Sequence, residues 1–153
     1  MPSTQETSKL AQALQRWADG KATLKEVRGY TDEQLYAVAR TAYNFFNQGK
    51  VKEARTIFQG LFAINPRDAY FARALGVVEY ASGNAEGSLA AWDVACRLAP
   101  DEAAGYLGRA EVFLAGGQKQ KAAEDLKRAA AAPKGSELEK TKSRALLDAL
   151  RAK

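Results

Sequence analysis

A period of 34 residues is the feature that most constrains what this 153-residue chain can fold into. Gly49 is followed after 34 residues by Gly83 and after 34 more by Gly117, and Pro66 returns as Pro100. Further positions repeat in the same register: Phe58, Trp92 and Leu126; Ala42, Gly76 and Ala110; and Ala54, Ser88 and Ala122. A repeat of this length is typical of helix–turn–helix arrays, in which each unit buries its apolar face against the next. The period therefore predicts an all-α array of three helix hairpins.

The residues inside each copy follow a known pattern. The first copy, from Val38 to Pro66, carries V-x2-T-A-x2-F…G…A-x3-F…P, and the second, from Ala72 to Pro100, carries A-x2-L-G…Y…G…S-x3-W…P. Both resemble the tetratricopeptide repeat. The third copy departs from the pattern, because Arg109 stands where a leucine is usual and Pro133 comes one residue early. The resemblance implies a right-handed superhelix of three hairpins, at about residues 35–68, 69–102 and 103–136.

Start and stop signals predict the individual helices. Thr31 and Gln34 have the spacing of a capping box, so a helix is expected over 32–47, ending before Gly49, where a left-handed conformation favours glycine. Its partner is expected over 51–64, because Asn65-Pro66 breaks it. The remaining signals are Asp68 as the cap of a helix over 69–82, Gly83 before a return helix to Leu98, Asp101 as the cap of the third pair, Gly116-Gly117 as its turn, and Pro133-Lys134-Gly135 as its end.

Two flanking segments complete the predicted architecture, an N-terminal tail and helical leader over residues 1–30 and a C-terminal capping helix over 137–153, on either side of repeats at 31–136. Met1 to Thr7 is polar and expected to be disordered, and an amphipathic helix is expected from Ser8 until Gly20 stops it. This leader is too short and too apolar on one face to be stable alone, so it either caps the array or pairs with a second copy. Ser136 and Glu139 form a capping box that opens the last helix, whose expected apolar stripe is Leu138, Ala145, Leu146, Ala149 and Leu150.

Composition removes most other classes of function. The chain has no histidine, the commonest acid–base group and the usual zinc ligand, so no catalytic residue, no metal and no cofactor is predicted. Its one cysteine, Cys96, cannot form an internal disulfide and sits in an apolar helical run typical of a buried side chain. The net charge of +5 is scattered, which indicates a solvated surface and not a nucleic-acid site. No signal peptide and no run of about 18 apolar residues is found, so a cytoplasmic protein without stable membrane insertion is expected.

In a repeat array of this kind the first helix of each pair lines a concave groove. The groove stripe of the family falls at the second, fifth, ninth and twelfth places, which here are Tyr36, Ala39, Tyr43 and Phe46; Tyr70, Arg73, Val77 and Tyr80; and Ala104, Leu107, Glu111 and Leu114. Arg40, Arg73 and Glu111 are available as polar anchors. Tyrosines offer a large contact area and keep a hydroxyl for a backbone carbonyl, which suits an extended apolar peptide.

Aromatic residues at helical spacing are more often core than site. That interpretation is preferred for six of them: Phe45, Phe58, Phe62, Phe71, Trp92 and Phe113. Tyr36, Tyr43 and Tyr70 are assigned to the groove because their register is offset from the core positions. A clamp for a C-terminal carboxylate, which this family builds from lysine and asparagine, is disfavoured because the matching residues are Ala39, Tyr43 and Arg73.

A closer resemblance covers nearly the whole chain. Thr23 to Ala39 (T-L-K-E-V-R-G-Y-T-D-E-Q-L-Y-A-V-A), Phe58 to Phe62, Asp68 to Phe71 and Leu75-Gly76 resemble the class II chaperones of bacterial type III secretion, which guard translocator proteins. The resemblance implies a cytoplasmic, non-enzymatic chaperone that needs no ATP. Such a chaperone holds an apolar, membrane-inserting translocator soluble until export and binds an extended segment of it in the groove. Tyr36 and Tyr43 match the aromatic groove positions of the family, and Arg40 stands where an aromatic is common.

Dimerisation and a rival interpretation remain open at the level of sequence. Leader helices pair in these chaperones, so the resemblance makes Leu10, Leu14 and Trp17 candidate dimer contacts. The positive net charge departs from the acidic character of small secretion chaperones. The alternative is a generic tetratricopeptide scaffold that binds a folded partner or a helix in another assembly.

Overall fold

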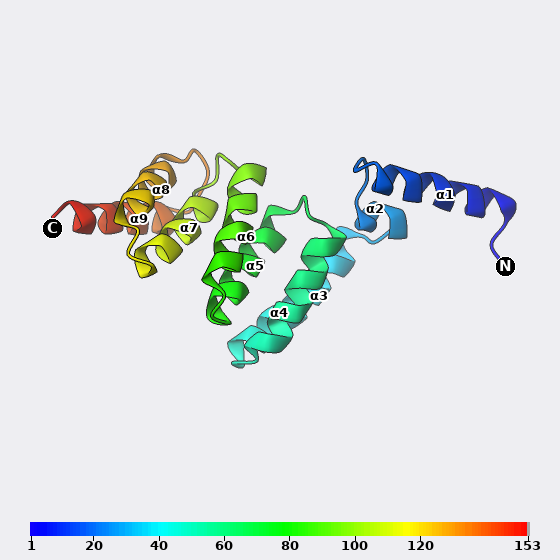
Figure 1. The fold of residues 1–153 in the computed structure, drawn as a ribbon, viewed down its shortest axis with the longest axis horizontal. Coiled ribbons are helices and arrows are strands. Elements are labelled where there is room, and N and C mark those ends of the chain that lie inside the picture. The colour runs from blue at the N-terminus through cyan, green and yellow to red at the C-terminus, as the bar shows by residue number, and fades with distance from the viewer. Residues whose placement is uncertain (153) are drawn as a thin grey trace. The chain divides into compact units, whose positions relative to one another are not determined.

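The computed structural model describes residues 1–152, which form nine helices and, within that range, no strand (Figure 1). The helices are α1 (Thr4–Ala18), α2 (Leu24–Arg28), α3 (Asp32–Asn47), α4 (Val51–Ile64), α5 (Ala69–Ala81), α6 (Ala85–Leu98), α7 (Ala103–Ala115), α8 (Lys119–Ala131) and α9 (Glu137–Arg151). They divide into two compact units, an N-terminal unit over Met1–Pro66 and a C-terminal unit from Arg67 onward. The all-α expectation is confirmed. None of the helices in residues 1–152 is both long and apolar enough to cross a bilayer.

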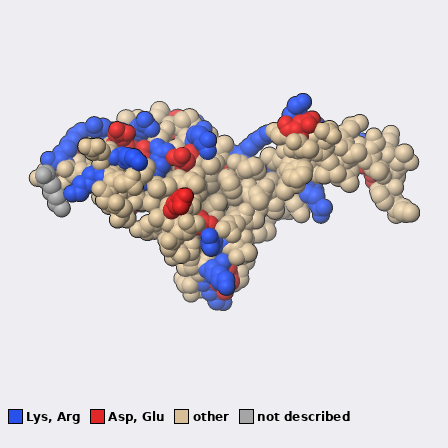
Figure 2. All heavy atoms as spheres, viewed as in Figure 1, with Lys and Arg blue, Asp and Glu red and all other residues tan. Residues whose placement is uncertain are grey.

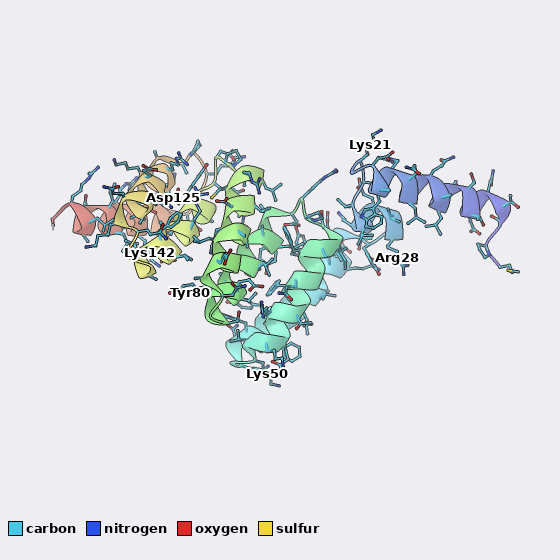
Figure 3. All side chains as sticks on the ribbon, viewed as in Figure 1. Lys21, Arg28, Lys50, Tyr80, Asp125 and Lys142 are labelled. Carbon is cyan, nitrogen blue, oxygen red and sulfur yellow. The ribbon has the colours of Figure 1, made fainter. Side chains whose placement is uncertain are left out.

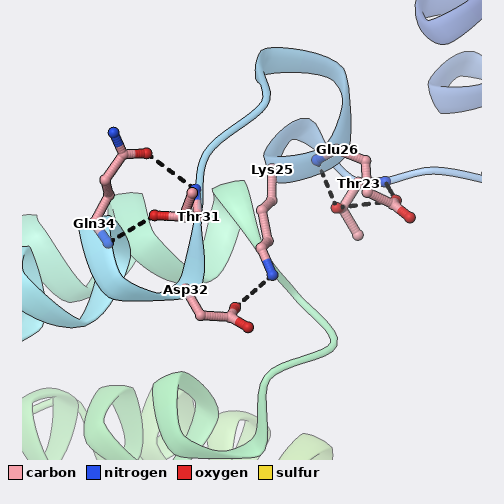
Figure 4. Close-up of polar contacts among 6 residues, drawn as sticks. All are labelled: Thr23, Lys25, Glu26, Thr31, Asp32 and Gln34. Atoms are coloured by element: carbon pink, nitrogen blue, oxygen red, sulfur yellow. Dashed lines mark hydrogen bonds and ion pairs between the residues drawn. The ribbon is translucent and has the colours of Figure 1, made fainter.

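Capping boxes start four of the helices. The boxes predicted at Thr31 and Ser136 are both present, and a further box at Thr23 starts α2 (Figure 4). The expectation of a disordered tail is wrong at its end, because Ser3 caps α1 and the Ser3 amide donates a hydrogen bond to the Glu6 carboxylate at 2.7 Å. This reciprocal cap satisfies two amides that would otherwise lack partners, so the helix begins at Thr4 and not at Ser8.

The N-terminal unit is built on the hairpin of α3 and α4. Leu35, Ala39 and Ala42 of α3 are buried, as are three apolar side chains of α4, namely Ala54, Phe58 and Leu61. Gly49 turns the chain between the two helices with φ +79°, as its left-handed role predicts. An ion pair between Lys25 and Asp32 ties α2 to the start of α3 (Figure 4).

The C-terminal unit packs two hairpins and the last helix. Gly76 on α5 is buried, and its carbonyl accepts a 2.6 Å hydrogen bond from the hydroxyl of Ser88 on α6, so small residues let the two backbones approach closely. The buried cluster of the second hairpin and α9 consists of Ala103, Leu107, Ala110, Ala122, Leu126, Ala129, Ala132 and Leu147. The inward positions expected for Ala42, Gly76 and Ala110 are confirmed.

Arg109, the departure from the repeat pattern, replaces an apolar contact with a charged network. Its Nε and Nη2 donate to the two carboxylate oxygens of Asp125 at 2.7 and 2.8 Å, and its Nη1 donates to Asp93 at 2.5 Å. Asp125 is buried on α8, while Asp93 is exposed on α6. The hydrogen bonds to Asp125 raise the pKa of the Arg109 guanidinium. One side chain thus connects three helices where the usual leucine would touch only apolar neighbours.

Two sequence expectations fail in the third repeat and the cap. Asp101 does not cap α7: the capping position is Glu102, and the Asp101 carboxylate pairs instead with Lys134 at 2.9 Å. The physical reason lies in the loop after α8. The Lys134 carbonyl in that loop accepts a hydrogen bond from the Ala103 amide at 2.7 Å, so this amide needs no side-chain cap.

The apolar stripe expected on α9 is wrong in three of its five residues. Leu138 is 78% exposed and Ala145 and Ala149 are exposed, whereas Ser143 and Leu147 are buried. Ser143 is accommodated because its hydroxyl donates to the carbonyl of Glu139, one turn earlier, at 2.7 Å. Leu146 and Leu150, which the stripe also contained, are half-buried and pack at the edge of the cluster.

Candidate functional site

The first candidate surface is the outward side of α3. Leu35, Ala39 and Ala42 turn into the hairpin, so the residues one place further along face away from it. The side chains of Tyr36 and Tyr43 are 43 and 54% exposed, so neither ring packs into the core of the hairpin. Arg40 is exposed between them, and Phe46 is half-buried below.

The second candidate surface lies on α5, in the C-terminal unit. Tyr70, Val77 and Tyr80 are 36, 42 and 46% exposed. Their spacing of seven and three residues keeps them on one face of the helix. Arg73 shares this face but is already engaged, because its Nη1 donates to the Glu102 carboxylate at 3.1 Å. Arg73 is therefore held by Glu102, the residue that caps α7.

A pocket of about 330 Å³ opens beside this face, with Val77 and Tyr80 of α5 on one side and Glu111 and Val112 of α7 on the other. Its floor is the indole of Trp92, contributed by α6. The indole fits between α5 and α7 because both helices have a glycine there. A Cβ on Gly76 would lie 2.7 Å from the ring, and one on Gly108 would lie 2.3 Å from it.

The sequence missed this pocket. Trp92 was assigned to the core, and it is indeed only 8% exposed, yet that small area forms the bottom of a cavity. Phe58 and Phe71 are fully core at 2 and 0%, while the other aromatics assigned to the core, Phe45, Phe62 and Phe113, are half-buried. The signal that could have revealed the pocket is Gly108, because a glycine in the interior of a helix is unfavourable unless something approaches it closely.

The rim of the pocket carries an ion pair that reaches across to the last helix. Glu111 on α7 pairs with Lys142 on α9, and their side chains are 44 and 52% exposed. Figure 3 marks Tyr80 and Lys142. The arrangement combines an apolar floor, aromatic and aliphatic walls, and one carboxylate, which is a chemistry for binding side chains.

Three expected groove residues pack on the core, since Leu114 is half-buried against the cluster of α7, α8 and α9, and two more are fully buried. Leu107 is 7% exposed and belongs to the buried cluster of α7, α8 and α9, and Ala39 is 1% exposed in the α3–α4 hairpin. In both cases the place in the repeat lies on the boundary between core and groove, and the α-helical direction of the side chain turns it inward. Neither residue is offered to a ligand in this structure.

The apolar stripe of the leader helix is exposed in the N-terminal unit. Leu10, Leu14 and Trp17 are 49, 44 and 46% exposed, and α1 has no buried residue. Within the N-terminal unit α1 packs on α2, and α2 in turn contacts α4 of the first repeat. Pairing with a second copy stays a prediction.

The described part of the chain has no metal-binding cluster, and its one thiol is buried. No grouping of His, Cys, Asp and Glu in residues 1–152 could hold a metal ion. Cys96 is buried, and this burial raises the pKa of its thiol to about 11, so the thiol is protonated at neutral pH and is a poor nucleophile.

Comparison with known proteins agrees with this geometry. The family model of the tetratricopeptide repeat matches residues 39–103 and 74–136, which together span more than half of the chain. No curated protein sequence matches significantly. The type III secretion translocator chaperone SycD of Yersinia enterocolitica has a similar structure, with a TM-score of 0.78 and 21% identity over 84% of this chain and 98% of SycD.

Two further solved structures share the fold. A type III secretion complex from Aeromonas hydrophila matches with a TM-score of 0.81 and 22% identity over 92% of this chain and 96% of its own. PcrH of Pseudomonas aeruginosa, solved with the chaperone-binding region of PopD, matches with a TM-score of 0.75 and 24% identity over 81% and 96%. The repeat pattern, the helix hairpins and the family model agree, and the chain belongs to the tetratricopeptide repeat family.

Proposed function

We propose that this protein is a non-enzymatic chaperone that binds an extended apolar segment of a type III secretion translocator and keeps that client soluble in the cytoplasm before export. The observation that carries the proposal is that the first helix of each of two repeats exposes large side chains on one of its own faces. Tyr36 and Tyr43 stand out from α3, and Tyr70, Val77 and Tyr80 stand out from α5. A fold shared with PcrH, which was solved bound to a region of PopD, supports the same role.

The physical task suits such surfaces. A client with membrane-inserting segments exposes apolar surface that aggregates in water, and burying that surface is worth about 25 cal/mol per Å². Tyrosine contributes contact area at a low cost in rotamer entropy and offers a hydroxyl to the client backbone. Helices α3 and α5 are fixed by their hairpins, so little ordering is needed on the chaperone side. No nucleotide or other cofactor is required for this mode of binding.

The proposal includes a second copy of the chain as a partner. Leu10, Leu14 and Trp17 form an apolar stripe on α1 with no cover inside the N-terminal unit. A helix with one such face is stabilised when a second apolar surface meets it. Pairing of two leader helices would bury all three side chains.

Tyr43→Ala tests the groove assignment. The full chain, tagged, is co-expressed with a candidate translocator that is insoluble alone, and the soluble client captured is measured. Removing the most exposed groove ring is expected to weaken capture by about tenfold, as loss of an aromatic contact typically does. Helicity is expected to stay unchanged because Tyr43 is not part of the α3–α4 core.

Tyr30→Ala is the matched control, since Tyr30 is 37% exposed but lies in the loop before α3. Equal capture of client by Tyr43→Ala and by the wild type would contradict the assignment of Tyr43 on α3 to the binding surface. A wild-type chain that leaves every candidate translocator insoluble would contradict the chaperone function itself.

A further inference from the structure

The pocket over Trp92 is apolar inside and charged at one point of its rim. Val77, Tyr80 and Val112 form walls above the indole. Among the described residues that line it, Glu111 is the charged one. A pocket of this kind accepts one apolar side chain, while the carboxylate beside the opening faces whatever residue comes next in an extended ligand.

Glu111 is held by α9 through an exchangeable contact. Its partner Lys142 is 52% exposed, and Glu111 itself is 44% exposed. Ion pairs as exposed as this one contribute between about 0 and 1 kcal/mol, so an incoming cation can take the place of Lys142 at little cost. The capping helix therefore supplies a competitor for the one anionic group of the pocket.

We propose that this pocket selects an apolar residue with a lysine or arginine next to it in the client segment. The apolar side chain enters above Trp92, and the neighbouring cation displaces Lys142 from Glu111. This inference rests on the proposed binding of an extended segment and adds the class of sequence that the C-terminal unit takes. Glu111 and Lys142 then act as a charge filter, with Lys142 rejecting ligands whose flanking residue cannot compete for the carboxylate.

The proposed preference for a basic ligand residue is opposite to the one that the positive net charge of the protein would produce, so the two effects can be told apart. The chain carries a net charge of +5, and Lys and Arg gather over the α8–α9 end of the C-terminal unit (Figure 2). The long-range field alone would favour an acidic peptide. A preference for a basic neighbour would therefore indicate a local carboxylate, and Glu111 is the carboxylate that lines this pocket.

The experiment uses the full chain carrying Trp17→Phe, so that Trp92 is the single tryptophan. An array of short, proline-flanked extended peptides varies the anchor among Leu, Ile, Met and Phe and its neighbour among Lys, Gln and Glu. Binding is followed by Trp92 fluorescence. We expect Lys-neighbour peptides to bind about twofold more tightly than Gln-neighbour peptides, because the new exposed pair is partly offset by loss of the Lys142–Glu111 pair.

Variants separate the filter from the pocket. Glu111→Gln should remove the charge preference, Glu111→Lys should reverse it, and Lys142→Ala should increase the affinity for Lys-neighbour peptides. Glu124→Gln makes the same charge change at an exposed site on α8 and should leave the ranking intact. Equal binding of the Lys, Gln and Glu series to the wild type would overturn the charge filter alone. Failure of every peptide in the array to bind would overturn the proposed segment-binding function as well.

Discussion

Replacing Arg109 by methionine should destabilise the C-terminal unit far more than any exposed arginine would. Methionine keeps most of the length and apolar stem of the side chain but removes the guanidinium. The Asp125 side chain, 4% exposed, then loses donors at 2.7 and 2.8 Å, while Asp93 at 59% turns to water (Figure 3 marks Asp125). The damage therefore comes from one buried carboxylate left without a cation.

The magnitude follows from that burial. Removing one partner of a buried ion pair costs about 3–5 kcal/mol, and the 15% exposure of Arg109 places this pair at the lower end, near 3 kcal/mol. With a urea m-value of about 2 kcal/mol per M, the midpoint should fall by about 1.5 M. Replacing both partners by leucine should recover most of the loss, because an apolar pair of similar size is often as stable as the charged one.

The assay is urea unfolding followed by Trp92 fluorescence in the Trp17→Phe background and by helical circular dichroism. Arg97→Met is the matched control, because Arg97 is an exposed arginine in the last turn of α6 and should cost about 0.5 kcal/mol or less. A midpoint for Arg109→Met equal to that of Arg97→Met would refute the reasoning. So would a double leucine variant less stable than Arg109→Met.

Two further predictions concern the floor of the pocket and the buried thiol. Gly108→Ala should lower the free energy of unfolding by about 1–2 kcal/mol and shift Trp92 emission, because the added Cβ meets the indole. Gly60→Ala is the control: it lies in a helix with open space around it, and should raise the free energy of unfolding by about 0.5–1 kcal/mol in the same assay. A stabilised Gly108→Ala would show that the ring does not need the glycine. The Cys96 thiol, with its pKa raised by burial from 9.0 to about 11, should alkylate at pH 8 about a hundredfold more slowly than an unfolded chain. Since the folded state favours the neutral thiol, stability should be full below pH 9 and decline as pH rises towards 11, and melting curves of Cys96→Ala should lack that part of the decline.

Local signals explain why most of the helix bounds could be predicted. The capping box at Thr31, the left-handed Gly49 and the break at Asn65-Pro66 each act within one turn of the chain, and α3 and α4 begin and end where those signals place them. Asp101 failed for a non-local reason. The loop that follows α8 supplies the carbonyl of Lys134 to the start of α7, and no signal near Asp101 announces it.

The candidate site was only partly predictable for a related reason. Tyr36 and Tyr43 could be assigned to the outside of α3 because their register alone sets them beside the core stripe. The pocket forms where three helices meet around Trp92. The indole fits there because Gly76 and Gly108 have no Cβ that would clash with it. In the sequence Arg109 could be read only as a departure from the repeat pattern, because its partners Asp93 and Asp125 lie on other helices.

The face that α9 buries differs from the predicted apolar stripe, and this difference keeps Lys142 available to the charge filter. Leu138, Ala145 and Ala149 share a helical face with Lys142, which stands between the first two at spacings of four and three residues. Burying that face would have taken the Lys142 ammonium out of water at a cost of several kcal/mol. Burying Ser143 and Leu147 instead keeps Lys142 at the surface, where it reaches Glu111. The same packing that hides one side of α9 thus decides which charge stands at the rim of the Trp92 pocket.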